Sequence, residues 1–144
     1  MTLSIISNNP EETKKLGKDL AKKLQGGEII SLIGDLGSGK TTFVQGAAEE
    51  FKIKEKIKSP TFVILKKYKI NNNKKLNSFF HIDLYRLGEI KSSEMLPFDI
   101  KEISNKKSIA FIEWGEKILP LLPKNIIKTK FEYINKNRRK IIIS

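Results

Sequence analysis

The sequence predicts an α/β fold that contains β-hairpins, and three stretches carry this prediction. Residues 29–33 form an apolar, β-branched run of strand length, which leads through a glycine-rich loop into a helix-like stretch over 42–50. Residues 108–113 form a second apolar run and are the best candidate for a further buried strand. Residues 125–144 are typical of a hairpin, because apolar and polar residues alternate on both sides of an Asn-Lys-Asn turn.

Length and composition predict a single domain over residues 1–144. Hydrophobic residues make up 39% of the chain, which is enough for a packed core and too many for a disordered chain. No apolar stretch approaches the length of a membrane span, and the N-terminus lacks a basic leader with a long apolar segment. The absence of cysteine excludes disulfides and thiolate metal sites. We therefore expect a cytoplasmic protein with no membrane partner.

The formal net charge of +12 raises the question of nucleic-acid binding. Nearly all of this charge is lysine, since Arg86, Arg138 and Arg139 are the only arginines. Lysine, isoleucine and asparagine share A/T-rich codons, so a biased genome accounts for the composition most simply. Reading of base edges also relies on arginine, which is scarce here. A basic face that meets RNA backbone or an acidic partner remains the alternative.

Three helices are expected outside the glycine-rich region. The first starts with Asn9 as cap and Pro10 in the first turn, and it ends at the glycine pair 26–27. Its apolar stripe, which suits it to cover a sheet face, consists of Leu16, Leu20 and Leu24. The others are expected over 92–103, interrupted at Pro97, and over 116–119.

The glycine-rich loop over 34–41 matches the pattern of a glycine, four free positions, and Gly-Lys-Thr. Its glycines allow positive φ, so that backbone N–H groups can converge on phosphate oxygens at a helix start. Lys40 supplies a positive charge for the β- and γ-phosphates, and Thr41 offers a hydroxyl to Mg²⁺. A turn that binds nothing is disfavoured, because the strand before the loop and the helix after it are both present. The predicted nucleotide-binding residues of this segment are Asp35, Leu36, Gly37, Ser38, Gly39, Lys40, Thr41 and Thr42.

Residues 61–68 and 76–83 are two strand candidates on either side of an asparagine-rich turn, which predicts a second hairpin. Residues 3–6 suggest a short edge strand. Pro60 fixes a bend before the hairpin. Thr61, beside that bend, is either an ordinary turn residue or a residue that contacts the γ-phosphate and Mg²⁺.

Two carboxylates follow apolar strands and are the candidate catalytic acids. Asp83 ends one such strand and Glu113 ends another, where a carboxylate is costly unless it has a purpose. We assign the metal to Asp83 and the orientation of water to Glu113, with both kept as candidate metal ligands. Trp114 is by default a packing residue, and the alternative is a stacking surface for a base or a partner. His81, the only histidine, is expected to be structural, because one histidine cannot build a metal site.

Four stretches now stand in order along the chain: GDLGSGKTT, SPTF, HIDLYR and IEWGE. Together they resemble TsaE, the bacterial P-loop ATPase family required for threonylcarbamoyladenosine synthesis in tRNA. The resemblance covers nearly the whole chain. Ser38 departs from the alanine usual in the family, which should not disturb phosphate binding.

The resemblance implies a three-layer, P-loop NTPase-like α/β fold with helices around a mixed, mainly parallel sheet. It implies ATP and Mg²⁺ as ligands and a turnover motif formed by Glu113 with Trp114. The other residues it assigns are Lys40 and Thr41 at phosphate and Mg²⁺, Thr61 in a switch-like loop, and Asp83 at the metal. Members hydrolyse ATP weakly alone. They dock on the TsaB/TsaD-like heterodimer that transfers threonylcarbamoyl to N6 of adenosine 37 in tRNA. The resemblance thus implies an ATPase, not the transferase, that meets tRNA mainly through this complex.

Three alternatives remain beside this reading. A small-molecule P-loop kinase shares the loop and the size, but such kinases use an arginine-bearing lid, and three arginines leave little for one. A GTPase needs an Asn-Lys-x-Asp base reader, and residues 105–108 lack the terminal acid. A basic RNA-binding adaptor that uses nucleotide as a structural ligand is the non-enzymatic alternative.

Overall fold

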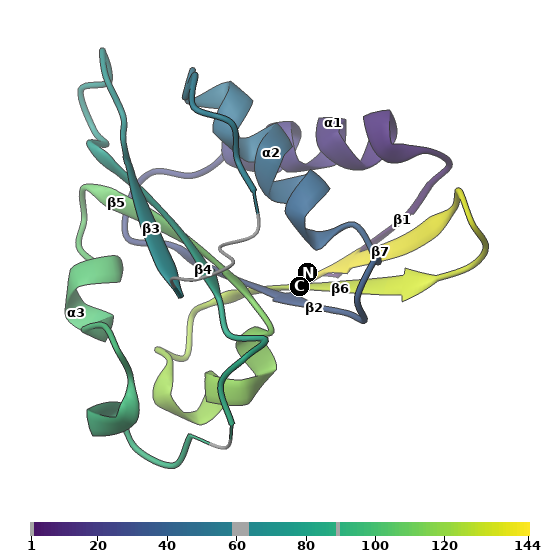
Figure 1. The fold of residues 1–144 in the computed structure, drawn as a ribbon. Coiled ribbons are helices and arrows are strands. Elements are labelled where there is room, and N and C mark those ends of the chain that lie inside the picture. The colour runs from purple at the N-terminus through teal and green to yellow at the C-terminus, as the bar shows by residue number, and fades with distance from the viewer. Residues whose placement is uncertain (1, 59–63, 89) are drawn as a thin grey trace.

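The computed structural model describes residues 2–58, 64–88 and 90–144, and a seven-stranded sheet runs through the molecule in the order β1-β7-β6-β2-β5-β4-β3 (Figure 1). The strands are β1 (Leu3–Ser7), β2 (Ile29–Ile33), β3 (Leu65–Lys69), β4 (Ser78–Asp83), β5 (Ser108–Glu113), β6 (Ile127–Tyr133) and β7 (Arg139–Ile143). The helices are α1 (Pro10–Ala21), α2 (Lys40–Glu50), α3 (Ile100–Ile103) and the 3₁₀ segments η1 (Ser93–Met95) and η2 (Gly115–Leu121).

Strand directions confirm the mixed, mainly parallel sheet. The central strands β6, β2, β5 and β4 are mutually parallel. At the two sides, β3 pairs with β4, and β7 with β6, in antiparallel fashion. Strand β1 is antiparallel to β7 and is therefore parallel to the central strands. Among the described strands, β3 and β7 run in the opposite direction to the others.

Two apolar clusters, one on each face of the sheet, produce the predicted three layers. Helices α1 and α2 lie side by side over one face, and α3 and η2 lie on the other (Figure 1). Successive side chains of β5 point to opposite faces. Phe111 therefore packs with Phe43 of α2, whereas Ile112 belongs to the cluster that contains Ile118 of η2.

The predicted C-terminal hairpin is confirmed, and it lies inside the sheet rather than at its edge. Strand β6 pairs with β2, and β7 pairs with β1, so the hairpin fills the sheet and leaves β1 and β3 at the edges. The reason is its apolar face: Phe131 and Ile141 are buried in the core beneath α1 and α2. The predicted hairpin over β3 and β4 is confirmed.

The helix starts follow from local chemistry. Helix α1 begins at Pro10, and the Asn9 side chain accepts a hydrogen bond from the backbone N–H of Glu12 at 2.8 Å, as a cap should. The helical stretch expected over 92–103 is interrupted at Pro97 as predicted, and the shorter segments η1 and α3 form on its two sides. Pro97 lies between them and cannot donate a backbone hydrogen bond. No helix in the described ranges is both long and apolar enough to cross a membrane.

Two glycines bring α1 and α2 into backbone contact. A Cβ added to Gly17 would lie 2.0 Å from the carbonyl oxygen of Phe43, and one added to Gly46 would lie 1.8 Å from that of Lys14. Side chains at these positions would force the helices apart. The close contact places the start of α1 beside the glycine-rich loop that begins α2.

Candidate nucleotide-binding site

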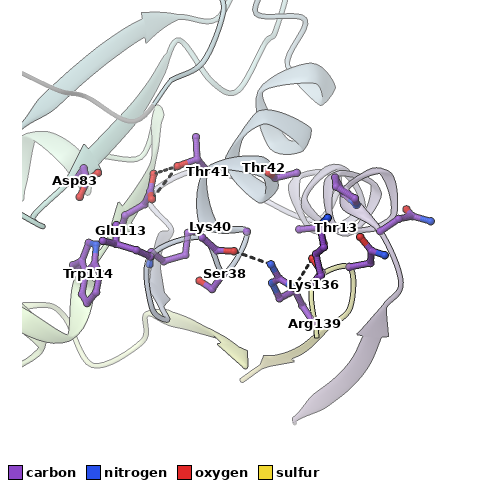
Figure 2. A pocket seen from close by; sticks show the side chains of 16 residues that line it. Thr13, Ser38, Lys40, Thr41, Thr42, Asp83, Glu113, Trp114, Lys136 and Arg139 are labelled. Carbon is purple, nitrogen blue, oxygen red and sulfur yellow. Dashed lines mark hydrogen bonds between the residues drawn. The ribbon is translucent and has the colours of Figure 1, made fainter. Parts of the chain in front are cut away.

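A cavity of about 340 Å³ opens at the carboxyl ends of the central strands, where α/β sheets usually bind ligands (Figure 2). The glycine-rich loop and the start of α2 form one wall. Asp83 and Glu113, which end β4 and β5, are opposite each other in the strand register and both line the cavity. The remaining lining residues are Asn9, Pro10, Thr13, Trp114, Lys136, Asn137 and Arg139.

The loop has the backbone that its sequence predicts. Gly37 and Gly39 have φ values of 75° and 102°, in the region that favours glycine, and Gly39 caps the start of α2. Gly34 is required for another reason, since an added Cβ would lie 2.9 Å from the carbonyl oxygen of Phe131. The loop is therefore shaped by both conformation and packing.

Lys40 is buried at the base of this loop. Its ammonium donates hydrogen bonds to the carbonyl oxygens of Gly34 and Asp35, the second at 3.0 Å, and it lies 4.2 Å from the centre of the Trp114 ring. Burial lowers the pKa of Lys40, and nearby negative charges, Glu113 foremost, oppose that shift. Trp114 thus packs against the loop lysine, and its own backbone is left-handed at φ 61°.

Glu113 joins the loop helix to β4 through two hydrogen-bonding partners. The hydroxyl of Thr41 lies 3.0 and 2.9 Å from the two carboxyl oxygens of Glu113. Figure 2 draws both contacts as dashed lines. On its other side, Nε2 of His81 lies 2.6 Å from Oε2 of Glu113. Both residues are buried, at 0% and 3% exposure. These hydrogen bonds compensate for the cost of burying the carboxylate.

His81 therefore contacts the site, a role that the sequence reading did not assign. One signal was available: His81 and Asp83 are two residues apart on a strand, so their side chains leave the same face of the sheet. The Nδ1 atom of His81 is buried and has no hydrogen-bond partner in the described part of the chain.

Asp83 lines the same cavity, where it accepts a hydrogen bond from the backbone N–H of Tyr85 at 2.9 Å. Lys117 fastens the turn that follows by donating to the carbonyl oxygens of Leu84, Tyr85 and Leu87 at 2.8 to 3.0 Å. Glu113, the other candidate acid, contacts Thr41 in this structure.

The oxygen atoms gathered here fit Mg²⁺ bound together with a nucleotide. Within the described ranges, no group of three or more acidic or histidine side chains could hold a metal by itself. Magnesium in nucleotide sites needs only one or two carboxylates beside phosphate oxygens and water. Thr41, Glu113 and Asp83 offer such hard oxygen ligands.

Residues far from the motif complete the cavity. Arg139 of the β6–β7 hairpin donates a hydrogen bond to the carbonyl oxygen of Gly37 at 2.8 Å, and Thr13 of α1 lies beside Gly39. No local pattern marked these residues as part of a site. Thr61, the candidate γ-phosphate residue, lies outside the described residues.

Comparison with known proteins identifies the family. The model of the family "Threonylcarbamoyl adenosine biosynthesis protein TsaE" matches residues 7–141. The chain belongs to the TsaE family. This confirms the resemblance carried by the four sequence motifs.

Relatives and a solved structure agree with this family. The protein from Aquifex aeolicus named tRNA threonylcarbamoyladenosine biosynthesis protein TsaE is 35% identical over 141 residues, which cover 96% of this chain and 93% of that protein. The protein of the same name from Rickettsia felis is 40% identical, over 94% of this chain and 75% of its own. The crystal structure of Bacillus subtilis YdiB superposes with a TM-score of 0.79 at 30% identity, covering 99% of this chain and 84% of that one.

The buried contact between His81 and Glu113 in this TsaE-family chain gives a stability prediction. His81→Leu removes a partner from a buried carboxylate, so the free energy of unfolding should fall by about 1–3 kcal/mol. In the Glu113→Gln background the same change should cost less, which gives a coupling energy of about 1 kcal/mol or more. Urea unfolding of the four proteins measures this. If the effects of the two substitutions on the free energy of unfolding add within about 0.5 kcal/mol, the contact does not contribute to stability.

Proposed function

We propose that this chain is an ATPase that binds ATP with Mg²⁺ in the cavity and supports the synthesis of N6-threonylcarbamoyladenosine at position 37 of tRNA. The observation that carries the ATPase proposal is the contact of Thr41 with Glu113 beside the buried Lys40. The tRNA pathway is supported by family membership and by the names of the relatives.

In this proposal each residue has a separate role in the transfer of the γ-phosphoryl group to water. The loop amides and Lys40 bind the phosphates, and Thr41 with a carboxylate holds Mg²⁺. When bound, the metal neutralises charge on the β- and γ-phosphate oxygens. Glu113 orients the attacking water, while His81 holds its carboxylate in place. Asp83 is the carboxylate that joins Thr41 in holding the metal, and Thr61 is the proposed contact with the γ-phosphate.

The proposed partner is the TsaB/TsaD-like heterodimer that transfers the threonylcarbamoyl group. Hydrolysis would be weak in the isolated chain and stimulated on docking, and the tRNA would be met mainly in this assembly. ATP is proposed over GTP because residues 105–108 lack the acid of a guanine-reading motif. The cytoplasm, where tRNA is modified, is the proposed location.

Hydrolysis of ATP by the purified chain, with and without the heterodimer, tests the proposal. We expect slow Mg²⁺-dependent hydrolysis that rises when the heterodimer is added. Lys40→Ala removes a buried charge that serves phosphate, so it should weaken ATP binding by about 10- to 150-fold, as the loss of 1.5–3 kcal/mol implies. A rate that the heterodimer leaves unchanged would refute docking-stimulated turnover. ATP-dependent phosphorylation of a metabolite would favour the kinase alternative.

A further inference from the structure

A second polar depression, of about 550 Å³, lies at the amino ends of β4 and β5. It is lined by Lys67, Lys69, Asn77, Ser78, Asn105 and Lys107, and we call it the basic depression. Asp83 and Glu113 end the same two strands at the nucleotide cavity, about 17 Å away for strands of six residues. In Figure 1 the turn of the β3–β4 hairpin and the start of β5 accordingly lie away from the loop between β2 and α2.

The chain around this depression is strongly basic. Residues 64–82 and 104–108 contain no aspartate or glutamate. Their seven lysines are Lys66, Lys67, Lys69, Lys74, Lys75, Lys106 and Lys107. In the described part of the chain none of these lysines forms an ion pair, whereas Lys14, Lys15 and Lys22 of the α1 region do. Among the described residues, the positive charge of these lysines is therefore not compensated by an ion pair.

Backbone hydrogen bonds join the start of β4 to the turn before β5 at this depression. The N–H groups of Asn77 and Ser78 both donate to the carbonyl oxygen of Lys107, at 2.8 and 3.3 Å. The Asn105 side chain accepts from the N–H of Lys107 at 2.9 Å, which braces that turn. Lys67 and Lys69 are two residues apart on β3, so they leave the same face of the strand. The backbone that carries the lysines is thus held in place before a ligand binds, so that binding has to order only their side chains.

We propose that the basic depression binds the phosphate backbone of RNA. Lysine ammonium, amide and hydroxyl groups contact phosphate and ribose. Arginine forks and aromatic stacking, two main means of reading bases, are absent from this lining, and the amide oxygens of Asn77 and Asn105 already accept hydrogen bonds from Ser78 and Lys107. The choice of RNA among polyanions rests on the proposed function in tRNA modification. Because the depression and the nucleotide cavity lie at opposite strand ends, RNA bound here leaves the cavity open.

Two matched triple variants test the proposal with an unmodified tRNA transcript as the probe. The test variant carries Lys67→Gln, Lys69→Gln and Lys107→Gln. The control carries Lys128→Gln, Lys130→Gln and Lys140→Gln, which change the net charge equally on the other half of the sheet. The test variant should bind tRNA at least about tenfold more weakly at low salt. Its slope of log affinity against log salt should be shallower by about 2, since each lost phosphate contact contributes about 0.7. The control should stay within about threefold of the parent.

Four outcomes would overturn the proposal. The first two are equal weakening of tRNA binding in both triple variants and no tRNA binding by the parent at low salt. The third is displacement of tRNA by millimolar inorganic phosphate, and the fourth is loss of heterodimer docking in the test variant with tRNA affinity unchanged. The third would identify a free-anion site, and the fourth an acidic protein partner. Nucleotide affinity and basal ATP hydrolysis should remain within about twofold in both triples. Lys40→Ala tests the nucleotide function separately, so failure of one proposal is distinguishable from failure of the other.

Discussion

Glu113→Gln is expected to lower the rate of ATP turnover by about 100-fold or more, while ATP affinity changes by less than about threefold. Glutamine keeps the size of the side chain but cannot accept a proton or hold water with a negative charge, and such groups contribute about 10²–10⁴ in rate. Glu113 lies between Thr41 and His81, so its position is already fixed before any ligand binds. Phosphate release measures the rate, and calorimetric titration with a non-hydrolysable ATP analogue measures the affinity.

Asp83→Asn is the matched control for Glu113→Gln, because the two residues are paired in the strand register and line one cavity. If Asp83 serves the metal, its variant should need more Mg²⁺ for half-maximal activity and should recover when Mg²⁺ is raised. Glu113→Gln should stay slow at saturating Mg²⁺. Recovery of Glu113→Gln by Mg²⁺ would exchange the two roles, and turnover at the parental rate would remove Glu113 from the mechanism.

Sequence reasoning succeeded where the determining interactions are local. The positive φ of Gly37 and Gly39 and the Asn9 cap are properties of a few neighbouring residues. The family resemblance supplied the parallel sheet that no local pattern could show. Given that sheet, Asp83 and Glu113 meet because adjacent parallel strands end at the same edge.

Long-range packing accounts for what the sequence did not show. The contact of Arg139 with the Gly37 carbonyl depends on the insertion of the β6–β7 hairpin beside β2, and an alternating pattern does not state which strand will be its neighbour. The role of His81 likewise depends on a residue 32 positions away.

Gly46→Ala is expected to lower the free energy of unfolding by about 3 kcal/mol or more. In an isolated helix alanine is favoured over glycine by about 1 kcal/mol, so propensity alone predicts the opposite sign. Packing decides the result, because the new Cβ would lie 1.8 Å from the backbone carbonyl oxygen of Lys14, and backbone cannot rotate away as a side chain can. The added methyl group must therefore push α1 away from α2.

Gly88→Ala is the control for this prediction. Apart from its chain neighbours, no atom of the described residues lies within 4 Å of the Cβ that it would add, so its stability should stay within about 0.5 kcal/mol of the parent. Urea unfolding compares the three proteins. Displacement of α1 also moves Asn9 and Thr13 relative to the loop of α2, so Gly46→Ala should weaken ATP binding although Gly46 does not line the cavity. A Gly46→Ala protein as stable as the parent would mean that the two helices are not held at backbone contact, and the cavity wall formed by α1 would then lack its structural basis.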